Sequence, residues 1–252
     1  MSAKVVDRHS TSKARLLRLL TELDEGVWCR RSVFLRPGLD AGPANTALHD
    51  MPDDERRTLA DIVSEIGPSD TGAAVFMGEG RATAVLPPFP FDTESHEQGV
   101  STIKLRNLLE RELLIGVVLL RMGRYAVAVL RGKCLSASKT DTRHVKNRHR
   151  AGGSSQRRFM RSRDRLVREL YDKTCEVVRD VFEPFGRNID YVLLGGERNT
   201  LRAFRERCRL LQDLGPKVLN RTLQMDRPNH ATLKGIAFEV WKSRVLTLEL
   251  ND

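Results

Sequence analysis

The sequence predicts a two-domain α/β protein whose second domain is a mixed β-sheet with helices packed on it. Three consecutive runs rich in β-forming residues, within 110–141, are separated by Gly-containing turns and predict a meander of antiparallel strands. From residue 157 onward, helix-like and strand-like segments alternate. A three-strand meander followed by αβαβαβ implies a mixed sheet. The boundary is expected near 95–105, which gives domains at 1–100 and 101–252.

The first domain is expected to be a smaller α/β unit. Leucines recur at helical spacing after residue 13, and Gly26 ends this helix. Pro, Gly, Asn and Asp dominate 37–52, which is typical of a loop. The expected elements are a helix at 13–26, a strand within 27–38, the loop at 37–52, a helix at 53–67 and a hairpin over 72–91.

The second domain is expected to contain one long helix at 157–182, after the meander. One face of this helix is apolar and carries Phe159, Leu166, Leu170, Val177 and Val181. The opposite face is basic and carries Arg158, Arg161, Arg165 and Arg168. Arg163 falls near the apolar face and does not fit this division. The remaining expected elements are a strand at 189–196, a helix at 198–211, a strand at 217–225, a helix at 229–244 and a final strand at 245–250.

Composition excludes several classes of protein. The longest apolar run, at 113–120, is too short to cross a bilayer, and the N-terminus lacks the apolar core of a signal peptide. The four cysteines are scattered without a Cys-x-x-Cys pair, which argues against a zinc ribbon and against a disulfide scaffold. These features predict a soluble cytoplasmic protein.

The net charge of +10 is concentrated in one segment. Between Arg131 and Leu170 there are thirteen basic and three acidic residues, so the rest of the chain is neutral overall. A cluster this rich in Arg predicts a polyphosphate partner, because the planar guanidinium makes bidentate contacts with phosphate. A solvated charged surface is the alternative interpretation.

The segment Gly152-Gly153-Ser154-Ser155-Gln156 lies between a basic loop and the basic helix. Two glycines allow the backbone to approach a ligand closely, and free amides at a helix N-terminus favour anions. The amide of Gln156 does not titrate, but it can orient a water or stabilise developing charge by hydrogen bonding. Alternatively, the glycines form a flexible loop, Ser155 caps the helix and Gln156 is an ordinary surface residue.

Two further sets of residues could carry chemistry. The histidines His144 and His149 flank the basic loop and could act as acid or base, although exposed or RNA-contacting histidines are more common. A metal-dependent nuclease would need clustered carboxylates. The acids considered for it are Asp141, Asp190, Asp213 and Asp226.

Residues 152–170, preceded by the basic loop and the meander, resemble the central domain of archaeal and eukaryotic class-1 peptide release factors. In that family a Gly-Gly-Gln loop precedes a basic helix containing Arg-Phe, here Arg158-Phe159. Ser154 stands where the Gln would be, and Gln156 comes two residues later. This Gly-x-x-Gln pattern is similar to the Vms-like release factors (VLRF) of ribosome quality control, in particular the actinobacterial and Chloroflexi-type branch. The segment 191–204 is also similar to the strand-Gly-helix unit of the superfamily.

The resemblance extends weakly to strand segments of the first domain, so 1–100 is expected to be a reduced release factor N-terminal domain. The stretch between Phe34 and Ala73 is too short for the helical hairpin that reads stop codons, which favours rescue of stalled nascent chains.

The resemblance implies a ribosome-associated factor whose Gly-x-x-Gln loop enters the peptidyl-transferase centre. The loop would hydrolyse peptidyl-tRNA or cleave the tRNA near its 3′ end. Its partners would be the large ribosomal subunit and peptidyl-tRNA, with no cofactor, metal, membrane or DNA. The catalytic residues implied are Gln156, Gly153 and Gly152. The RNA-binding residues implied are Arg143, Lys146, Arg148, Arg150, Arg157, Arg158, Arg161, Arg165 and Arg168. The alternatives are a non-catalytic ribosome- or RNA-binding protein and the metal-dependent nuclease.

Overall fold

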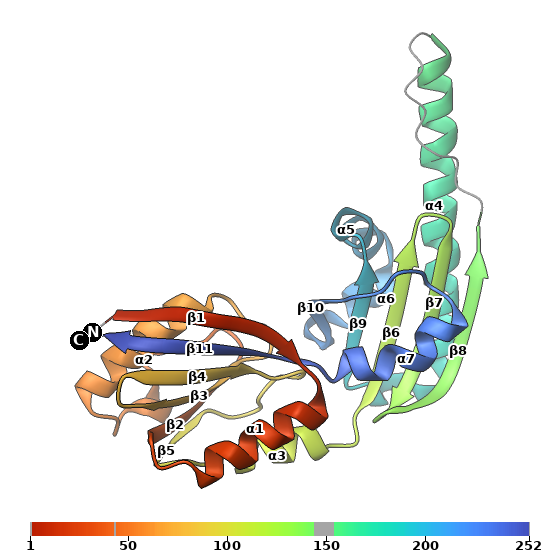
Figure 1. Ribbon diagram of the computed structural model, residues 1–252. Coiled ribbons are helices and arrows are strands. Elements are labelled where there is room, and N and C mark those ends of the chain that lie inside the picture. The colour runs from red at the N-terminus through yellow and green to blue at the C-terminus, as the bar shows by residue number, and fades with distance from the viewer. Residues whose placement is uncertain (1, 43, 144–153, 252) are drawn as a thin grey trace. The chain divides into compact units, whose positions relative to one another are not determined.

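The computed structural model describes residues 2–42, 44–143 and 154–251, and for residues 154–157 and 159 it describes the backbone only. The chain forms two compact units (Figure 1). The first unit contains 1–111 and 241–252, and the second contains 112–240. The mixed α/β class with two sheets is as predicted, but the last segment of the chain belongs to the first unit.

The first unit is a six-stranded sheet of order β1-β11-β4-β3-β2-β5. Its strands are β1 (Ser2–Thr11), β2 (Cys29–Leu35), β3 (Ala73–Gly78), β4 (Arg81–Leu86), β5 (Ser95–Gln98) and β11 (Ser243–Asn251). Its helices are α1 (Lys13–Glu25), α2 (Asp53–Ile66) and α3 (Ile103–Glu110). The predicted helices at 13–26 and 53–67 and the hairpin over 72–91 are confirmed.

The two faces of this sheet bury different elements. Val33 and Val75 pack with Leu59 and Ile62 of α2, in one apolar cluster. Side chains alternate along a strand, so Phe34 and Phe76 lie on the other face, and their rings meet edge to face at 6.4 Å. The ammonium group of Lys104 stands over the Phe34 ring, which places α3 on this second face.

Strand β11 corrects one expectation. The final strand was predicted to complete the second sheet, yet β11 pairs antiparallel with β1 on one side and with β4 on the other. Strand β1 itself was not predicted, because its residues are mostly polar and it lies at the sheet edge. The expected domain limits of 1–100 and 101–252 therefore differ from the compact units at both the 111–112 and the 240–241 crossings.

The second unit is a five-stranded sheet of order β10-β9-β6-β7-β8. Its strands are β6 (Leu114–Arg121), β7 (Arg124–Arg131), β8 (Cys134–Thr142), β9 (Tyr191–Gly196) and β10 (Val218–Leu223). Its helices are α4 (Ser154–Phe182), α5 (Arg198–Arg207), α6 (Arg209–Asp213) and α7 (His230–Val240). The 3-10 turns of the chain are η1 (Thr46–Leu48), η2 (Glu183–Asn188) and η3 (Gly215–Lys217).

The predicted meander is confirmed, since β6, β7 and β8 pair antiparallel, while β9 runs parallel to β6 and β10 parallel to β9. Helices α4 and α5 share a buried cluster with one face of the sheet. Helix α4 packs closely there, because a Cβ at Gly116 would stand 2.6 Å from the Phe182 ring. The helix predicted at 198–211 is divided at Cys208 into α5 and α6.

Candidate nucleic-acid interface

In the sequence the basic loop, residues 143–153, lies between the end of β8 and the start of α4. Most of the predicted loop residues lie outside the described residues: Gly152, Gly153, Lys146, Arg148, Arg150, His144 and His149. Helix α4 begins at Ser154, three residues earlier than predicted, so Gln156 and Arg157 belong to its first turn. Backbone N–H groups of a first helical turn have no intrahelical partner, and they make this end of α4 electropositive.

The β8 side of the loop is anchored by hydrogen bonds. The backbone N–H of Arg143 donates to the carbonyl of Gly123 at 2.8 Å. The hydroxyl of Tyr125 donates to Asp141 Oδ2 at 3.3 Å, and the N–H of Thr142 donates to Asp141 Oδ1 at 2.7 Å. Burial, and then the Asp141 carboxylate, raise the pKa of Tyr125 to about 12, so this phenol is neutral and able to donate at neutral pH.

The α4 side of the loop is a helix packed over only part of its length. Leu170, Val177, Val178 and Val181 are buried against the sheet, and Val167 is the first residue of α4 that packs on this cluster. At about 1.5 Å per residue, the stretch from Ser154 to Val167 is about 20 Å long. Figure 1 shows this stretch extending past the ends of the strands of its own unit. The start of α4 is thus held away from the body of the second unit.

The outer face of α4 carries the arginines that the periodicity assigned to it. Arg158, Arg161, Arg165 and Arg168 are all exposed. The single ion pair described for this set joins Arg165 Nε to Glu169 Oε1 at 3.6 Å. An exposed ion pair of this kind contributes little to the stability of the fold, and the Arg165 guanidinium can exchange it for another partner. We name Arg158, Arg161, Arg165 and Arg168 the outer arginines.

Helix α5 holds the packed half of α4 through contacts that the sequence did not reveal. Arg207 makes two hydrogen bonds with the Asp172 carboxylate, at 2.5 and 2.7 Å, and they lower the pKa of Asp172. A disulfide joins Cys175 to Cys208. The sequence argued only against a disulfide scaffold and did not reveal this single bond, because the two residues are 33 apart in sequence and meet only once α5 packs on α4.

The acids considered for a nuclease have separate surroundings. Asp141 is engaged by Tyr125 and Thr142, and Asp190 Oδ2 accepts the N–H of Leu114 at 2.7 Å. In the parts of the chain that the structure describes, no group of three or more His, Cys, Asp or Glu residues could hold a metal ion. Nor does any helix within those parts combine the length and apolar character needed to cross a membrane.

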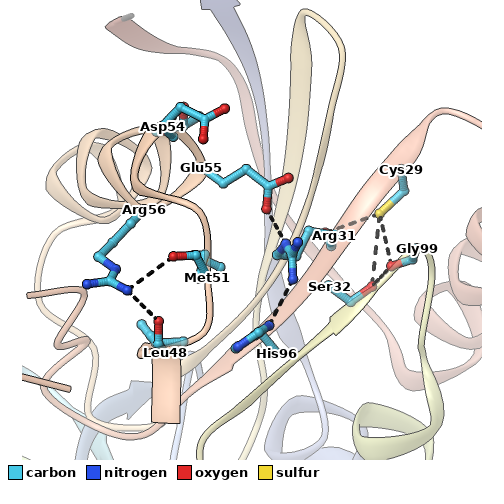
Figure 2. A network of polar contacts seen from close by, with 11 residues as sticks. Cys29, Arg31, Ser32, Leu48, Met51, Asp54, Glu55, Arg56, His96 and Gly99 are labelled. Atoms are coloured by element: carbon cyan, nitrogen blue, oxygen red, sulfur yellow. Dashed lines mark hydrogen bonds and ion pairs between the residues drawn. The ribbon is translucent and has the colours of Figure 1, made fainter. Parts of the chain in front are cut away.

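The first unit contains a second polar cluster, which Figure 2 shows at close range. Arg31 of β2 forms an ion pair with Glu55 of α2, and its Nη1 donates to His96 Nδ1 at 2.9 Å. A cavity of about 390 Å³, which Arg31 and Glu55 help to line, lies beside the pair. Burial, and then the positive charge of Arg31, lower the pKa of His96, so the ring accepts as neutral imidazole. The network joins β2, α2 and β5.

The chain thus has a two-sheet α/β fold, and the protruding basic helix α4 begins within its Gly-Gly-x-x-Gln motif. The family model described as Actinobacteria/chloroflexi VLRF1 release factor matches residues 114–246, more than half of the chain. The chain belongs to this family, which confirms the resemblance found in the sequence.

Two curated relatives are peptide chain release factor subunit 1 proteins of archaea. The protein from Archaeoglobus fulgidus is 32% identical over 115 residues, which is 46% of this chain and 28% of the relative. The protein from Thermococcus sibiricus is 28% identical over 163 residues, covering 60% of this chain and 39% of the relative. The chain therefore spans well under half the length of these two relatives.

Two solved structures were also found to be similar. The crystal structure of the archaeal translation termination factor aRF1 has 19% identity and a TM-score of 0.35, with 86% of this chain and 67% of that chain covered. The Vms1 mitochondrial localization core has 12% identity and a TM-score of 0.41, with 71% and 76% covered.

Proposed function

We propose that this protein releases nascent chains from tRNA on stalled ribosomes, with Gln156 as the residue that acts at the scissile bond. The observation that carries the proposal is the position of Gln156 in the first turn of α4, about 17 Å along the helix from Val167, where packing on the core begins. A motif held on a long, narrow extension suits a substrate enclosed within a large particle. Membership in a release factor family supports the same assignment.

The chemistry proposed for Gln156 is positioning. A carboxamide offers both a donor and an acceptor and does not titrate, so it orients a nucleophile rather than deprotonating it. Gly152 and Gly153, which lack a Cβ, would allow the backbone to approach the RNA closely. The reaction is hydrolysis of the peptidyl-tRNA ester or cleavage of the tRNA near its 3′ end, and no cofactor is invoked for either.

The RNA-binding part of the proposal rests on charge. The outer arginines would hold phosphates of the large ribosomal subunit and of peptidyl-tRNA, together with Arg157 and the loop residues Arg143, Lys146, Arg148 and Arg150. Each phosphate contact releases counterions, so ribosome binding should weaken steeply with salt. Such a protein would act in the cytoplasm, where its substrate forms.

The test compares Gln156→Ala and Gly153→Ala with the wild type. Large-subunit complexes carrying labelled peptidyl-tRNA are mixed with saturating protein, and single-turnover release is followed while the tRNA 3′ end is mapped. Gln156→Ala should retain binding and slow release about 100-fold or more, the scale of losing one preorganised hydrogen-bonding group at a reacting centre. Gly153→Ala should also impair release.

Sedimentation with ribosomal subunits provides the control for binding. Equal release by the wild type and Gln156→Ala would refute the catalytic assignment, and the protein would then be a non-catalytic ribosome binder. An intact tRNA 3′ end after release would assign ester hydrolysis, and a shortened one would assign tRNA cleavage.

A further inference from the structure

At one end of the strands of the second sheet lie arginines that are far apart in the sequence. Arg121 ends β6, Arg124 begins β7, Arg143 follows β8 and Arg198 begins α5 directly after β9. Strand register brings them together: Arg121 pairs with Arg124, Arg124 pairs with Thr142, and Leu120 pairs with Gly196. We name Arg121, Arg124, Arg143 and Arg198 the strand-end surface. Only Arg143 was expected from the sequence to bind RNA.

The like charges of this surface lower the stability of the sheet. Arg121 and Arg124 lie directly opposite each other across the two-residue turn at Met122 and Gly123, and both are exposed. Like charges directly opposite on neighbouring strands destabilise a sheet. Among the described residues none of the four arginines forms an ion pair, and the Arg121 guanidinium donates to the main-chain carbonyl of Asp226.

Two carboxylates close in sequence to this surface have described hydrogen bonds to neutral groups only. Asp141 accepts hydrogen bonds from Tyr125 and Thr142, and Glu197 accepts one from Thr200 at 3.2 Å. All four arginines are exposed and none is in a described ion pair, so their guanidinium groups still have N–H donors for an external anion.

Arg163 of α4 extends this surface onto the helix. It lies seven residues before Leu170, which is fully buried in the core, so it points in the same direction as the packed face. Arg163 comes four residues before Val167, the first residue of α4 that packs on the core, so it lies in the protruding part of the helix. Arg163 is half-buried, and its Nε is enclosed without a hydrogen-bond partner among the described residues. A buried N–H without a hydrogen-bond partner is costly unless a ligand, such as a phosphate oxygen, accepts from it.

Arg163 and the outer arginines leave α4 on opposite sides. Arg161 and Arg163 are two residues apart, which is about 200° around a helix of 3.6 residues per turn. The protruding part of α4 is thus basic on two opposite sides, although the sequence indicated only one.

We propose that Arg163 and the strand-end surface form a second phosphate-binding surface, so that the protruding helix is held between two separate RNA segments. The inference rests on the proposed function only in taking RNA as the partner. Guanidinium groups suit RNA because they bind phosphate bidentately, and repeated phosphates match a surface with several unpaired arginines.

The main experiment uses two double variants of the full chain with equal charge changes. Arg121→Glu/Arg124→Glu alters the strand-end surface. Arg131→Glu/Lys133→Glu alters the exposed hairpin at the opposite end of the same strands, around Gly132. Co-sedimentation with purified bacterial large ribosomal subunits is measured over a KCl series. The strand-end variant should bind at least about 10-fold more weakly, and its log–log salt slope should fall by about 2, at about 0.9 per lost phosphate contact. The control should remain within about twofold of the wild type.

A second variant separates binding from folding. Arg163→Leu continues the apolar face and removes the enclosed Nε–H that has no described partner, so thermal stability should be unchanged or higher. Its affinity for the subunits should nevertheless fall about threefold or more. A residue with a merely structural role would lose stability and binding together.

The results that overturn the inference are clear. It is wrong if the strand-end variant and the control bind equally, if Arg163→Leu binds as the wild type does, or if the wild type does not bind the subunits. Failure of the proposed function is distinguishable, because it is read from release by Gln156→Ala at saturating protein, which does not depend on these arginines.

Discussion

The rigidity of the protruding part of α4 can be tested with one proline. Ser162 lies between the start of the helix and Val167, the first residue that packs. A proline there removes the N–H of residue 162 and clashes with the carbonyl of residue 158, at about 3 kcal/mol in a helix interior. That penalty lowers the population of continuous helix by a factor of about 160, at about 1.36 kcal/mol per factor of ten.

The consequence should be local. The eight residues from Ser154 to Arg161 are too few to stay helical alone in water, so the first turn with Gln156 would lose its fixed direction. The buried half of α4, from Leu170 to Phe182, would keep its contacts. Ser162→Pro should therefore unfold within about 2 °C of the wild type, yet release peptide at least about 10-fold more slowly.

Thermal unfolding and single-turnover release are measured on the same preparations. Ser162→Ala is the matched control, because Ala favours the helix, and it should behave as the wild type in both assays. Release by Ser162→Pro at the wild-type rate would refute the reasoning, since the direction of the helix would then be irrelevant.

Three further predictions concern charge and protonation. Reversing Arg158, Arg161 and Arg165 to Glu should abolish co-sedimentation with ribosomal subunits at moderate salt without lowering thermal stability; retained binding would exclude this face. Spectrophotometric titration should show one tyrosine with a pKa of about 12, absent in Tyr125→Phe; because this pKa is raised, the stability it contributes is complete below pH 10 and is lost as pH rises toward 12. The pKa of His96 is lowered, so the stability that this residue contributes is present above the ordinary histidine pKa of 6.5 and is lost as pH falls through the folded pKa. The free energy of unfolding, measured with urea at several pH values, should therefore change less with pH in His96→Gln than in the wild type.

The sequence predicted those parts of the fold that depend on local patterns. Periodicity located the meander, the long helix and the packed face around Leu170, because apolar residues recur with the period of the helix or strand whose face is buried. It could not assign β11 to a sheet, since alternation along 245–250 fits either sheet equally well. It missed β1 because an edge strand requires few apolar residues.

The candidate site was predictable where it is continuous in sequence. Helical spacing predicted the outer arginines, whereas the role of the Gly-Gly-x-x-Gln motif was implied by the resemblance to a family. The strand-end surface depends on strand register, which brings Arg121, Arg124 and Arg198 together from distant segments. The sequence shows Arg163 as an exception near the apolar face. That it faces the strand-end surface can be inferred only once the position of the sheet along α4 is known.

The placement of β11 has a consequence for the order in which the chain folds during its own synthesis. Residues 112–240 are contiguous and leave the ribosome before β11 does, so the second unit can fold while the first is still incomplete. Until residues 243–251 emerge, β1 and the adjoining edge of β4 lack the strand that lies between them. Unpaired strand edges invite association with other chains. The first unit is therefore begun early and completed late, and a chain interrupted before residue 243 would contain a folded basic unit attached to an open sheet.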